Sequence, residues 1–360
     1  MMKVFHNFLK VLTAFMLSLL CTLTLASCRK PAEVSLTNIH WQPQQSGVSA
    51  SLRGISAVSE KVAWASGTNG TVVRTTDGGN RWQVRAVPGA DSLDFRDVQA
   101  VDDLTVYLMS AGPGDRSRIY KTSDGGETWE LQFTNDFPDG FLDGFAFWNP
   151  ETGLAYGDPV AGHLFVIKTM DGGATWERIP PENIPPVIEG EVGFAASGTG
   201  IVVIGEAQAW IGTGGAAPRV FRSMDQGETW AVAATPIASG QSAGIFSIAF
   251  QDTENGVIAG GDYQRDNLAN RNIAVTKDGG QTWDLIEEPH SVGFRSCVSY
   301  SSTSNILVAV GTSGSDYSSN FGRTWTRIDT SGYHTLSFES SGEAGWAAGA
   351  NGRIAKLVID

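Results

Sequence analysis

Residues 122–129 read Thr-Ser-Asp-Gly-Gly-Glu-Thr-Trp, and this phrase returns along most of the chain. Close copies occupy residues 75–82, 169–176, 223–230 and 276–283, and a degenerate copy, Ser-Asn-Phe-Gly-Arg-Thr-Trp, occupies residues 319–325. The spacings are 47, 47, 54, 53 and 42 residues between the tryptophans that end the copies, which are Trp82, Trp129, Trp176, Trp230, Trp283 and Trp325. Repeats at such intervals indicate a propeller or another array of similar units.

The residue types of the phrase predict a tight hairpin turn. Gly-Gly supplies positions that accept positive φ, and an Asp carboxylate can accept hydrogen bonds from the amides of its own turn. A catalytic role would require several of these carboxylates in one cleft, whereas one copy per unit spreads them around a rim. We therefore interpret the five repeated aspartates as structural; they are Asp77, Asp124, Asp171, Asp225 and Asp278.

Between the copies, the chain reads as short strands separated by Gly, Asn, Asp and Ser. In one unit, residues 95–101, 105–109, 118–122 and 128–132 predict four strands, and the repeated phrase joins the third to the fourth. One such sheet cannot bury both of its faces alone, but sheets stacked around an axis can. The pattern predicts an all-β propeller of four-stranded blades.

The two ends of the repeat array predict seven blades. The last unit has three expected strands, at 333–338, 345–348 and 353–357, and no copy of the phrase. The sequence Ile39-His40-Trp41-Gln42 resembles the missing fourth strand, and Trp41 precedes Trp82 by one blade length. We therefore expect the N-terminal strand to complete the last blade and close a seven-bladed ring over residues 38–360, which leaves no open edge strand.

The repeated phrase matches the Asp-box, also called the BNR repeat. Together with the strands expected at 52–58, 63–67 and 73–79, it makes the chain resemble the photosystem II stability/assembly factor family. Relatives of that family occur in non-photosynthetic bacteria, and some are labelled oxidoreductases. The same box and blade occur in sialidases, xyloglucanases and the sortilin ectodomain, where the boxes mark the fold away from the active site. The resemblance is specific for fold and does not by itself choose an activity.

The first residues read as a targeting segment. Lys3 and Lys10 bracket a charged region, an apolar run follows over 11–26, and Leu25-Ala26-Ser27-Cys28 matches the bacterial lipobox. The match implies a removed signal peptide (1–27), a lipidated Cys28 and a tether (28–37). Arg29 after the cysteine implies, by enterobacterial sorting rules, an outer-membrane anchor facing the periplasm. The alternative is a simple secretory signal with an incidental cysteine.

Charge and cysteine content limit the partners. The formal net charge is −13, and removal of residues 1–27 takes away two lysines and no acids, so 23 − 38 leaves −15. This balance disfavours nucleic acid and anionic lipid surfaces, so we expect membrane contact through the lipid anchor alone. With Cys21 removed and Cys28 lipidated, Cys297 would stand alone as a small buried residue, and no disulfide is expected. We expect a monomer.

Loop lengths point to one face of the ring, here called the mouth. Long segments between second and third strands are expected at 111–118, 157–163, 205–219 and 261–272, and long crossings between blades at 132–141, 179–191 and 232–244 emerge on the same face. The first hairpins, such as 102–103 and 197–200, are short. Loops this long in a compact domain are usually functional, so we expect any binding site at the mouth.

Charged residues are expected to gather at the mouth in two arcs. The basic candidates open the first strands of four blades and are Arg53, Arg96, Arg295 and His334. The acidic candidates are Asp143, Asp158, Glu206 and Asp262, the last three each following a glycine that we place at the end of a second strand. Opposed arcs suit a ligand with a carboxylate and a hydroxylated or cationic part. The alternative is a water-filled channel lined by salt bridges.

The leading functional hypothesis is a lipid-anchored binding or assembly scaffold that holds an envelope protein or a small carboxylated or hydroxylated ligand and performs no chemistry. The alternative is an exo-acting, sialidase-like glycoside hydrolase, in which Arg53, Arg96 and Arg295 grip the substrate and Asp158 and Glu206 act as acid and base. Seven blades rather than six, and no Phe/Tyr-Arg-Ile-Pro signature, count against it. An oxidoreductase is third. No cofactor and no metal are predicted, because no nucleotide loop, haem motif or ligand cluster is visible.

Overall fold

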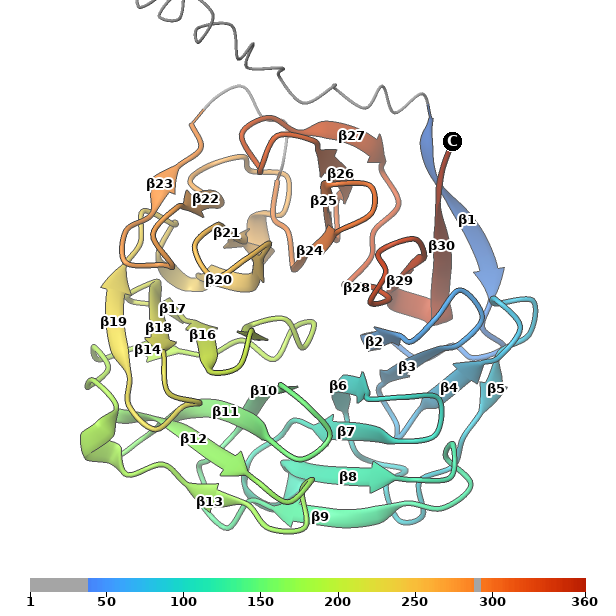
Figure 1. Ribbon diagram of the computed structural model, residues 1–360, viewed down its shortest axis with the longest axis horizontal. Coiled ribbons are helices and arrows are strands. Elements are labelled where there is room, and N and C mark those ends of the chain that lie inside the picture. Colours follow the sequence, from blue (N-terminus) through green and yellow to red (C-terminus); the bar gives the residue numbers. More distant parts are fainter. Residues whose placement is uncertain (1–37, 288–292) are drawn as a thin grey trace, which may run out of the picture. The chain divides into compact units, whose positions relative to one another are not determined.

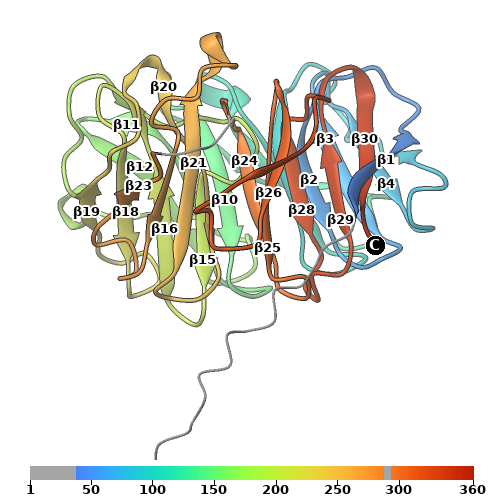
Figure 2. The same ribbon diagram turned by 90° about the horizontal axis from the view of Figure 1, so that it is seen from above.

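Seven antiparallel sheets of short strands stand around a central axis in residues 38–359 (Figure 1). The computed structural model describes residues 38–287 and 293–360. The signal peptide and tether predicted for 1–27 and 28–37, with Cys28, lie outside the described residues. In the view at right angles, the strands run from one face of the ring to the other (Figure 2).

The first three blades follow chain order from the innermost strand outwards (Figure 1). Blade 1 consists of β2 (Leu52–Ala57), β3 (Ala63–Gly67), β4 (Val72–Thr75) and β5 (Gln83–Val84). Blade 2 consists of β6 (Phe95–Ala100), β7 (Val106–Ser110), β8 (Arg118–Thr122) and β9 (Glu130–Thr134). Blade 3 consists of β10 (Leu142–Phe147), β11 (Gly153–Val160), β12 (His163–Thr169) and β13 (Glu177–Arg178).

The remaining blades follow the same plan with two additions. Blade 4 consists of β15 (Ile201–Ile204), β16 (Gln208–Gly212), β18 (Arg219–Ser223) and β19 (Ala231–Ala234). Blade 5 consists of β20 (Gly240–Phe250), β21 (Gly256–Asp262), β22 (Ile273–Thr276) and β23 (Asp284–Leu285), and its sheet is extended by β14 (Glu191–Val192) and β17 (Gly214–Gly215). Blade 6 consists of β24 (Cys297–Ser301), β25 (Ile306–Gly311), β26 (Gly314–Ser318) and β27 (Thr326–Asp329).

Blade 7 joins the two ends of the ring. It consists of β28 (Thr335–Phe338), β29 (Gly345–Ala348), β30 (Arg353–Ile359) and the N-terminal β1 (Ile39–Gln45). Strand β1 pairs antiparallel with β30 from Ile39↔Ile359 to Gln45↔Arg353. The all-β, seven-bladed propeller closed by the N-terminal strand, predicted from the sequence, is confirmed. Single-turn 3₁₀ helices interrupt the connections as η1 (Gly114–Arg116), η2 (Pro181–Asn183), η3 (Tyr263–Arg265) and η4 (Ala350–Gly352).

The core lies between neighbouring blades. Strands β3 and β7 are buried along their whole length, whereas the outer β9 is half-buried or exposed. Trp64 of blade 1 shares a cluster with Phe95 and Leu108 of blade 2, and Leu52 of blade 1 shares another with Trp346 of blade 7. Stacking therefore buries the faces that a single sheet would leave in water, which is the main stabilising contribution to such a ring.

The repeated phrase forms the turn between the third and fourth strands. In blade 2, Asp124 Oδ1 accepts hydrogen bonds from the amides of Glu127 (3.0 Å) and Thr128 (2.9 Å), and Oδ2 accepts one from the Thr128 hydroxyl (2.6 Å). These bonds, the Thr128 hydroxyl first, lower the pKa of Asp124 to about 2. The carboxylate of the repeat accepts the amide four residues later at Asp77, Asp171, Asp225 and Asp278 as well. In the degenerate copy, Asn320 takes the place of the aspartate.

The strand assignment predicted for blade 4 is wrong by one strand. We expected residues 197–200 to form its first hairpin and 205–219 to connect its second and third strands. Instead β15 is the first strand, residues 205–207 form the first hairpin, and the second-to-third connection covers only 213–218. The run before β15 alternates small and apolar residues and so has the pattern of a strand, but it does not join the ladder of blade 4.

Two predicted long loops are also strands. Residues 157–163 belong mostly to the extended hairpin of β11 and β12, whose turn is Ala161-Gly162 with φ of +55° and +84°. In the crossing expected at 232–244, the residues from Gly240 onwards belong to β20. The backbone groups of these residues pair with each other in strands, so the mouth is bordered by hairpins as well as by loops.

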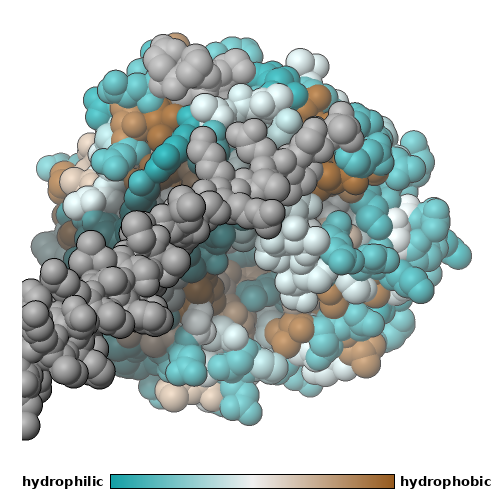
Figure 3. Space-filling view, turned by 45° about the horizontal axis from the view of Figure 1, so that its top comes forward, coloured by the Kyte–Doolittle hydropathy of each residue, from teal (hydrophilic) through white to brown (hydrophobic). Residues whose placement is uncertain are grey.

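Large exposed apolar side chains such as Met170, Met224 and Phe321 are scattered, and Figure 3 shows brown residues interspersed with teal ones on the visible side. No helix in the described part of the chain has the length and hydropathy of a membrane span. Cys297 is buried with a free thiol.

Candidate functional site

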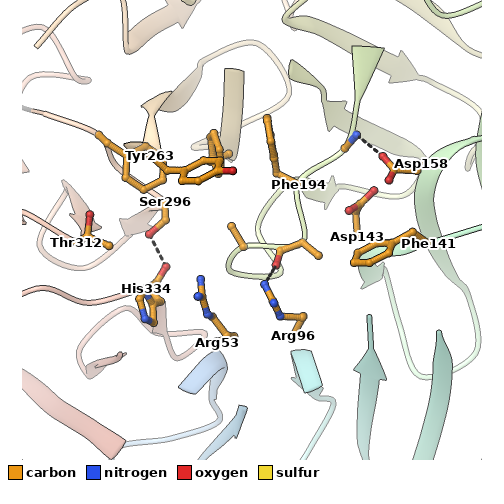
Figure 4. Close-up of a pocket in the computed structure, with 15 residues that line it drawn as sticks. Arg53, Arg96, Phe141, Asp143, Asp158, Phe194, Tyr263, Ser296, Thr312 and His334 are labelled. Carbon is orange, nitrogen blue, oxygen red and sulfur yellow. Dashed lines mark hydrogen bonds between the residues drawn. The ribbon is translucent and has the colours of Figure 1, made fainter. Parts of the chain in front are cut away.

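A cavity of about 410 Å³ lies at the mouth, where first strands begin and second strands end (Figure 4). This volume is within the range of small-ligand sites. The lining side chains named below fall into a basic group, an acidic group and an aromatic group; they are Arg53, Arg96, His334, Asp143, Asp158, Phe141, Phe194, Phe246, Tyr263 and Phe294.

One side of the cavity is formed by residues 193–200, here called the central segment, of which 193–196 line it. Ser197 Oγ donates to the carbonyl of Ser296 in blade 6 (2.7 Å), and Thr335 Oγ1 of blade 7 donates to the Ser197 carbonyl (3.1 Å). Thr199 Oγ1 lies 2.7 Å from Ser247 Oγ of blade 5. These bonds tie the segment to blades 5, 6 and 7. Because blade 7 lies across the ring from blades 3 and 4, which the segment connects, the segment crosses the axis and obstructs the central channel (Figure 1).

Close approach explains why the central segment is rich in glycine. Gly198 has φ of +75°, and a Cβ on it would lie 2.1 Å from Asp97 Oδ1. A Cβ on Gly193 would lie 2.0 Å from Asp143 Oδ2. Any larger residue at either position would displace a buried carboxylate, so glycine is required for the segment to pass.

The basic group occupies the starts of blades 1, 2 and 7. Arg96 is held by Asp94 (2.7 Å) and donates from Nη1 to the Ala195 carbonyl (2.8 Å; Figure 4). Arg53 Nε is buried without a hydrogen-bond partner, and Arg53 has no salt bridge to any residue in the described ranges. Burial, and then Arg96, lower the pKa of Arg53 to about 10, so it stays charged at neutral pH. Burial, with Arg53 and Arg96 nearby, lowers the pKa of His334 to about 3, which makes its ring neutral.

The acidic group lies opposite, on blade 3. Asp158 Oδ1 accepts a hydrogen bond from the Gly193 amide (3.0 Å), while Asp143 Oδ2 is buried with no hydrogen-bond partner. Figure 4 shows the two carboxylates beside each other. Burial, and then the charge of Asp158, raise the pKa of Asp143 well above its usual range, and burial raises the pKa of Asp158. Neither forms a salt bridge with another described residue.

Aromatic rings form the third side. Phe194 of the central segment stacks on Phe246 with ring centroids 4.0 Å apart, and Phe294 meets Phe246 edge-on at 4.7 Å. Tyr263, at the start of η3, is half exposed and approaches Phe246 edge-on at 6.2 Å. The site therefore combines a basic side, an acidic side and an apolar surface.

Five of the eight residues proposed from the sequence meet at this cavity. They are Arg53, Arg96, His334, Asp143 and Asp158. What each of them binds stays a prediction. The sequence pattern placed them correctly because the start of a first strand and the end of a second strand meet at the same face of every blade.

Glu206 does not belong to the mouth. It lies in the turn between β15 and β16, where its carbonyl accepts a hydrogen bond from Gln226 Nε2 in the β18–β19 turn (2.8 Å). First hairpins and third-to-fourth turns both lie on the face opposite the mouth, so the placement of Glu206 was wrong. The cause is the blade 4 misassignment, which made a first strand look like a second one.

Arg295 and Asp262 lie near the mouth, as predicted, but they do not line the cavity. Arg295 is fully buried and its guanidinium pairs with Asp316, with 2.9 Å from Nε to Oδ2. Asp262 is held by the Ser242 hydroxyl (2.8 Å) and Arg265 (2.7 Å). Both side chains are satisfied by neighbours from their own part of the fold, so the predicted arcs are shorter than expected.

The aromatic side and the central segment were not predicted from the sequence. Phe194, Phe246 and Phe294 looked like ordinary core residues, since a phenylalanine that faces a cavity and one that faces a core have the same pattern. The signal that was available is the run Gly193-Phe194-Ala195-Ala196-Ser197-Gly198-Thr199-Gly200, whose small residues suit a crowded passage. Within the described residues, no group of three or more His, Cys, Asp or Glu side chains is placed to hold a metal ion.

Comparison with known proteins finds the fold but no family. The chain matches no family model and no curated protein. Among solved structures, it is similar to YCF48 bound to D1 peptide, with a TM-score of 0.64, 18% identity, and coverage of 89% of this chain and 97% of that one. It is also similar to YCF48 from Cyanidioschyzon merolae, with a TM-score of 0.60, 18% identity, and coverage of 88% and 98%.

A third similar structure is an enzyme. The GH74 xyloglucanase from Xanthomonas campestris superposes with a TM-score of 0.64 and 14% identity over 88% of this chain, which spans about half of that enzyme (53%). At these identities the comparisons show the fold alone. The propeller fold expected from the resemblance to the photosystem II assembly factors is therefore shown, and activity is left to the chemistry of the site.

Proposed function

We propose that this protein is a binding or assembly scaffold of the bacterial cell envelope that holds a carboxylate-bearing segment of a partner protein in the cavity at its mouth. The observation that carries the proposal is Arg53, a charged guanidinium that faces the cavity with no hydrogen bond or ion pair from any described residue. A charge taken out of water is costly unless it is paired.

A carboxylate is the partner that this side of the cavity suits best. The planar guanidinium presents parallel N–H donors that match the two oxygens of a carboxylate. Arg96 lies next to Arg53 but is already occupied by Asp94 and the Ala195 carbonyl, and the neutral His334 ring adds no charge. Arg53 is therefore the one cation of the basic group that is left to pair with an anionic group of a ligand.

The cavity size favours the end of a chain over its middle. A volume of about 410 Å³ accommodates a terminal residue and its carboxylate, whereas the central segment blocks passage through the ring. The structurally similar YCF48 has been solved with a D1 peptide, which supports a peptide as the ligand of this propeller type. We infer that the bound group is the free C-terminal carboxylate of a partner.

Binding of tripeptides measured by isothermal titration calorimetry tests this proposal. A peptide acid should bind at least tenfold more tightly than the matching amide, because the amide lacks the anion that pairs with Arg53. Arg53→Gln should abolish this preference, and Arg81→Gln, at an exposed position in the turn after β4 on the opposite face, should retain it. Equal affinity for acid and amide would overturn the proposal.

We further propose that the protein is attached to the outer membrane, facing the periplasm, through a lipid on Cys28. The support is the match of residues 25–28 to the lipobox. Metabolic labelling with an alkyne-bearing fatty acid should mark the parent protein, and Cys28→Ser should lose the label and leave the membrane fraction. Labelling of the Cys28→Ser variant would refute the anchor.

The hydrolase alternative loses the pair of groups on which it was based. Asp158 is at the mouth and Glu206 is on the opposite face, so they cannot act on one glycosidic bond, which requires two carboxyl groups roughly 5–10 Å apart. Arg295 is also buried against Asp316 and does not complete an arginine triad.

A further inference from the structure

Binding of a carboxylate by Arg53 does not explain the acidic side of the cavity. Asp143 and Asp158 carry no salt bridge from any residue in the described ranges, and one carboxylate oxygen of Asp143 is buried with no hydrogen-bond partner. An acceptor left unsatisfied in a buried site is costly, and in native proteins such a group calls for a ligand or another explanation. Both side chains line the cavity, so a ligand can reach them.

The acidic and basic sides are separated by a single residue. Ala195 accepts a hydrogen bond from Arg96 through its carbonyl (2.8 Å), and its amide is near enough to Asp143 to oppose the larger effect of burial on the pKa of that carboxyl. Figure 4 shows Arg53 and Arg96 on one side of the cavity and the carboxylate pair on the other. One residue of a ligand can therefore reach both groups if it has a carboxylate at one end and a flexible cationic side chain at the other.

The surface between the two sides suits an aliphatic stem. Phe141 and Phe194 line the cavity near the acidic pair, and Phe194 is stacked on Phe246 at 4.0 Å. The methylene stems of lysine and arginine pack on apolar surface while their charged ends seek a polar partner, and aromatic faces attract the cation itself.

We propose that the site selects a partner whose C-terminal residue is basic, with the terminal carboxylate on Arg53 and the side-chain cation on Asp158 and Asp143. This inference rests on the proposed function, since it assumes that Arg53 binds the carboxylate. The charges agree with it. Burial, and then the charge of Asp158, raise the pKa of Asp143, so a cation beside the two carboxyl groups would stabilise their ionised forms, and on the other side Arg53 supplies a positive charge with no salt bridge from a described residue. A ligand residue that carries both a cation and a carboxylate therefore meets a group of opposite charge at each end.

Three tripeptides separate the two proposals: Ala-Ala-Lys acid, Ala-Ala-norleucine acid and Ala-Ala-Lys amide. Norleucine keeps the four-carbon stem and lacks the ammonium. Calorimetry on the full chain should show the lysine acid binding at least tenfold more tightly than the norleucine acid. Asp158→Asn should remove that preference and keep the acid-over-amide preference, because an asparagine oxygen can still accept the Gly193 amide.

Controls and contrary outcomes are distinct. Asp103→Asn, at an exposed position in the first hairpin of blade 2, should leave both preferences intact, and Asp143→Asn provides a second test if Asp158→Asn melts early. If lysine and norleucine acids bind equally and both exceed the amide, the basic-residue inference is wrong and the carboxylate proposal stands. If acid and amide bind equally, or none of the three peptides binds, the carboxylate proposal fails and the inference fails with it.

Discussion

At the scale of single residues, the centre of this ring is unusual for the carboxyl groups it buries. Asp97 on β6 lies beneath the central segment, where Oδ2 accepts the Phe145 amide (3.1 Å) and Oδ1 faces Gly198. No salt bridge from a described residue compensates it. Burial therefore raises the pKa of Asp97 from 3.8 to about 7. The neighbouring blades tolerate this because the protonated form is neutral.

The raised pKa of Asp97 predicts a stability that falls as pH rises. Between about pH 4 and 7 the folded state binds a proton at Asp97 that the unfolded state has released, so the free energy of unfolding decreases by a total on the order of 4 kcal/mol. The Asp97→Asn variant has no carboxyl group to titrate at this position, so its free energy of unfolding should decrease less over the same pH range. Urea denaturation of both proteins at pH 4.5, 6 and 7.5 measures the difference, in which the contribution of His334 cancels. Identical pH profiles would show that Asp97 titrates normally.

At the scale of elements, the repeated turn is a local structure that its own residues specify. In blade 2, Gly125 and Gly126 have φ of +75° and +84°, and the amide of Gly126 donates to Thr122 Oγ1 (3.0 Å). A Cβ on Gly125 would lie 2.6 Å from Arg74 Nη1. The hydrogen bond from the glycine amide to the Ser or Thr hydroxyl four residues earlier recurs in other blades, whatever packs around the turn. The turns could therefore be located from the sequence.

Gly125→Val should therefore destabilise the fold and leave the site unchanged. A β-branched residue at positive φ costs about 1–3 kcal/mol, which should appear as a lower melting temperature in a thermal scan. Ser123→Val is the matched control, because Ser123 is exposed in the same turn and is not at positive φ. The acid-over-amide preference should be equal in both variants. A Gly125→Val protein that melts with the parent would refute this description of the turn.

Blade 4 shows where reasoning at this scale fails. The residues just before 197 alternate small and apolar side chains as a strand does, and taking them as the first strand of blade 4 placed Glu206 at the mouth. The central segment instead satisfies its polar groups through Ser247, Ser296 and Thr335, which are far away in the sequence. Local pattern cannot distinguish a segment that pairs with the next strand from one that pairs with the opposite side of the ring.

At the scale of the whole molecule, the ring is held closed by one strand from the other end of the chain. The Trp41 ring lies 5.2 Å from that of Tyr333, and Trp41 Nε1 donates to Ser315 Oγ of blade 6 (2.8 Å). Strand β1 covers the outer edge of β30 over seven residue pairs, from Ile39 to Gln45. Without it, β30 would present unpaired amides and carbonyls to other molecules.

Deleting β1 (residues 39–45) should therefore open the ring. We expect a lower melting temperature and concentration-dependent association on size-exclusion chromatography with light scattering. Gln42→Ala, at an exposed position of β1, keeps the backbone pairing and should behave as the parent protein. A deletion variant that is monomeric and as stable as the parent would contradict closure by this strand.

The sequence by itself determined the repeat, the turns, the number of blades and the closing strand, because each depends on local residue types or on a spacing that recurs. It also placed Arg53, Arg96, His334, Asp143 and Asp158 at one face, since the ends of strands in a repeated blade always meet there. Only the tertiary structure decided that Arg295 is neutralised by Asp316, that Glu206 faces the other way and that residues 193–200 cross the axis. Those outcomes depend on contacts between residues that are far apart in the sequence. The local pattern of one blade cannot specify which buried charges meet or which backbone segment passes between them.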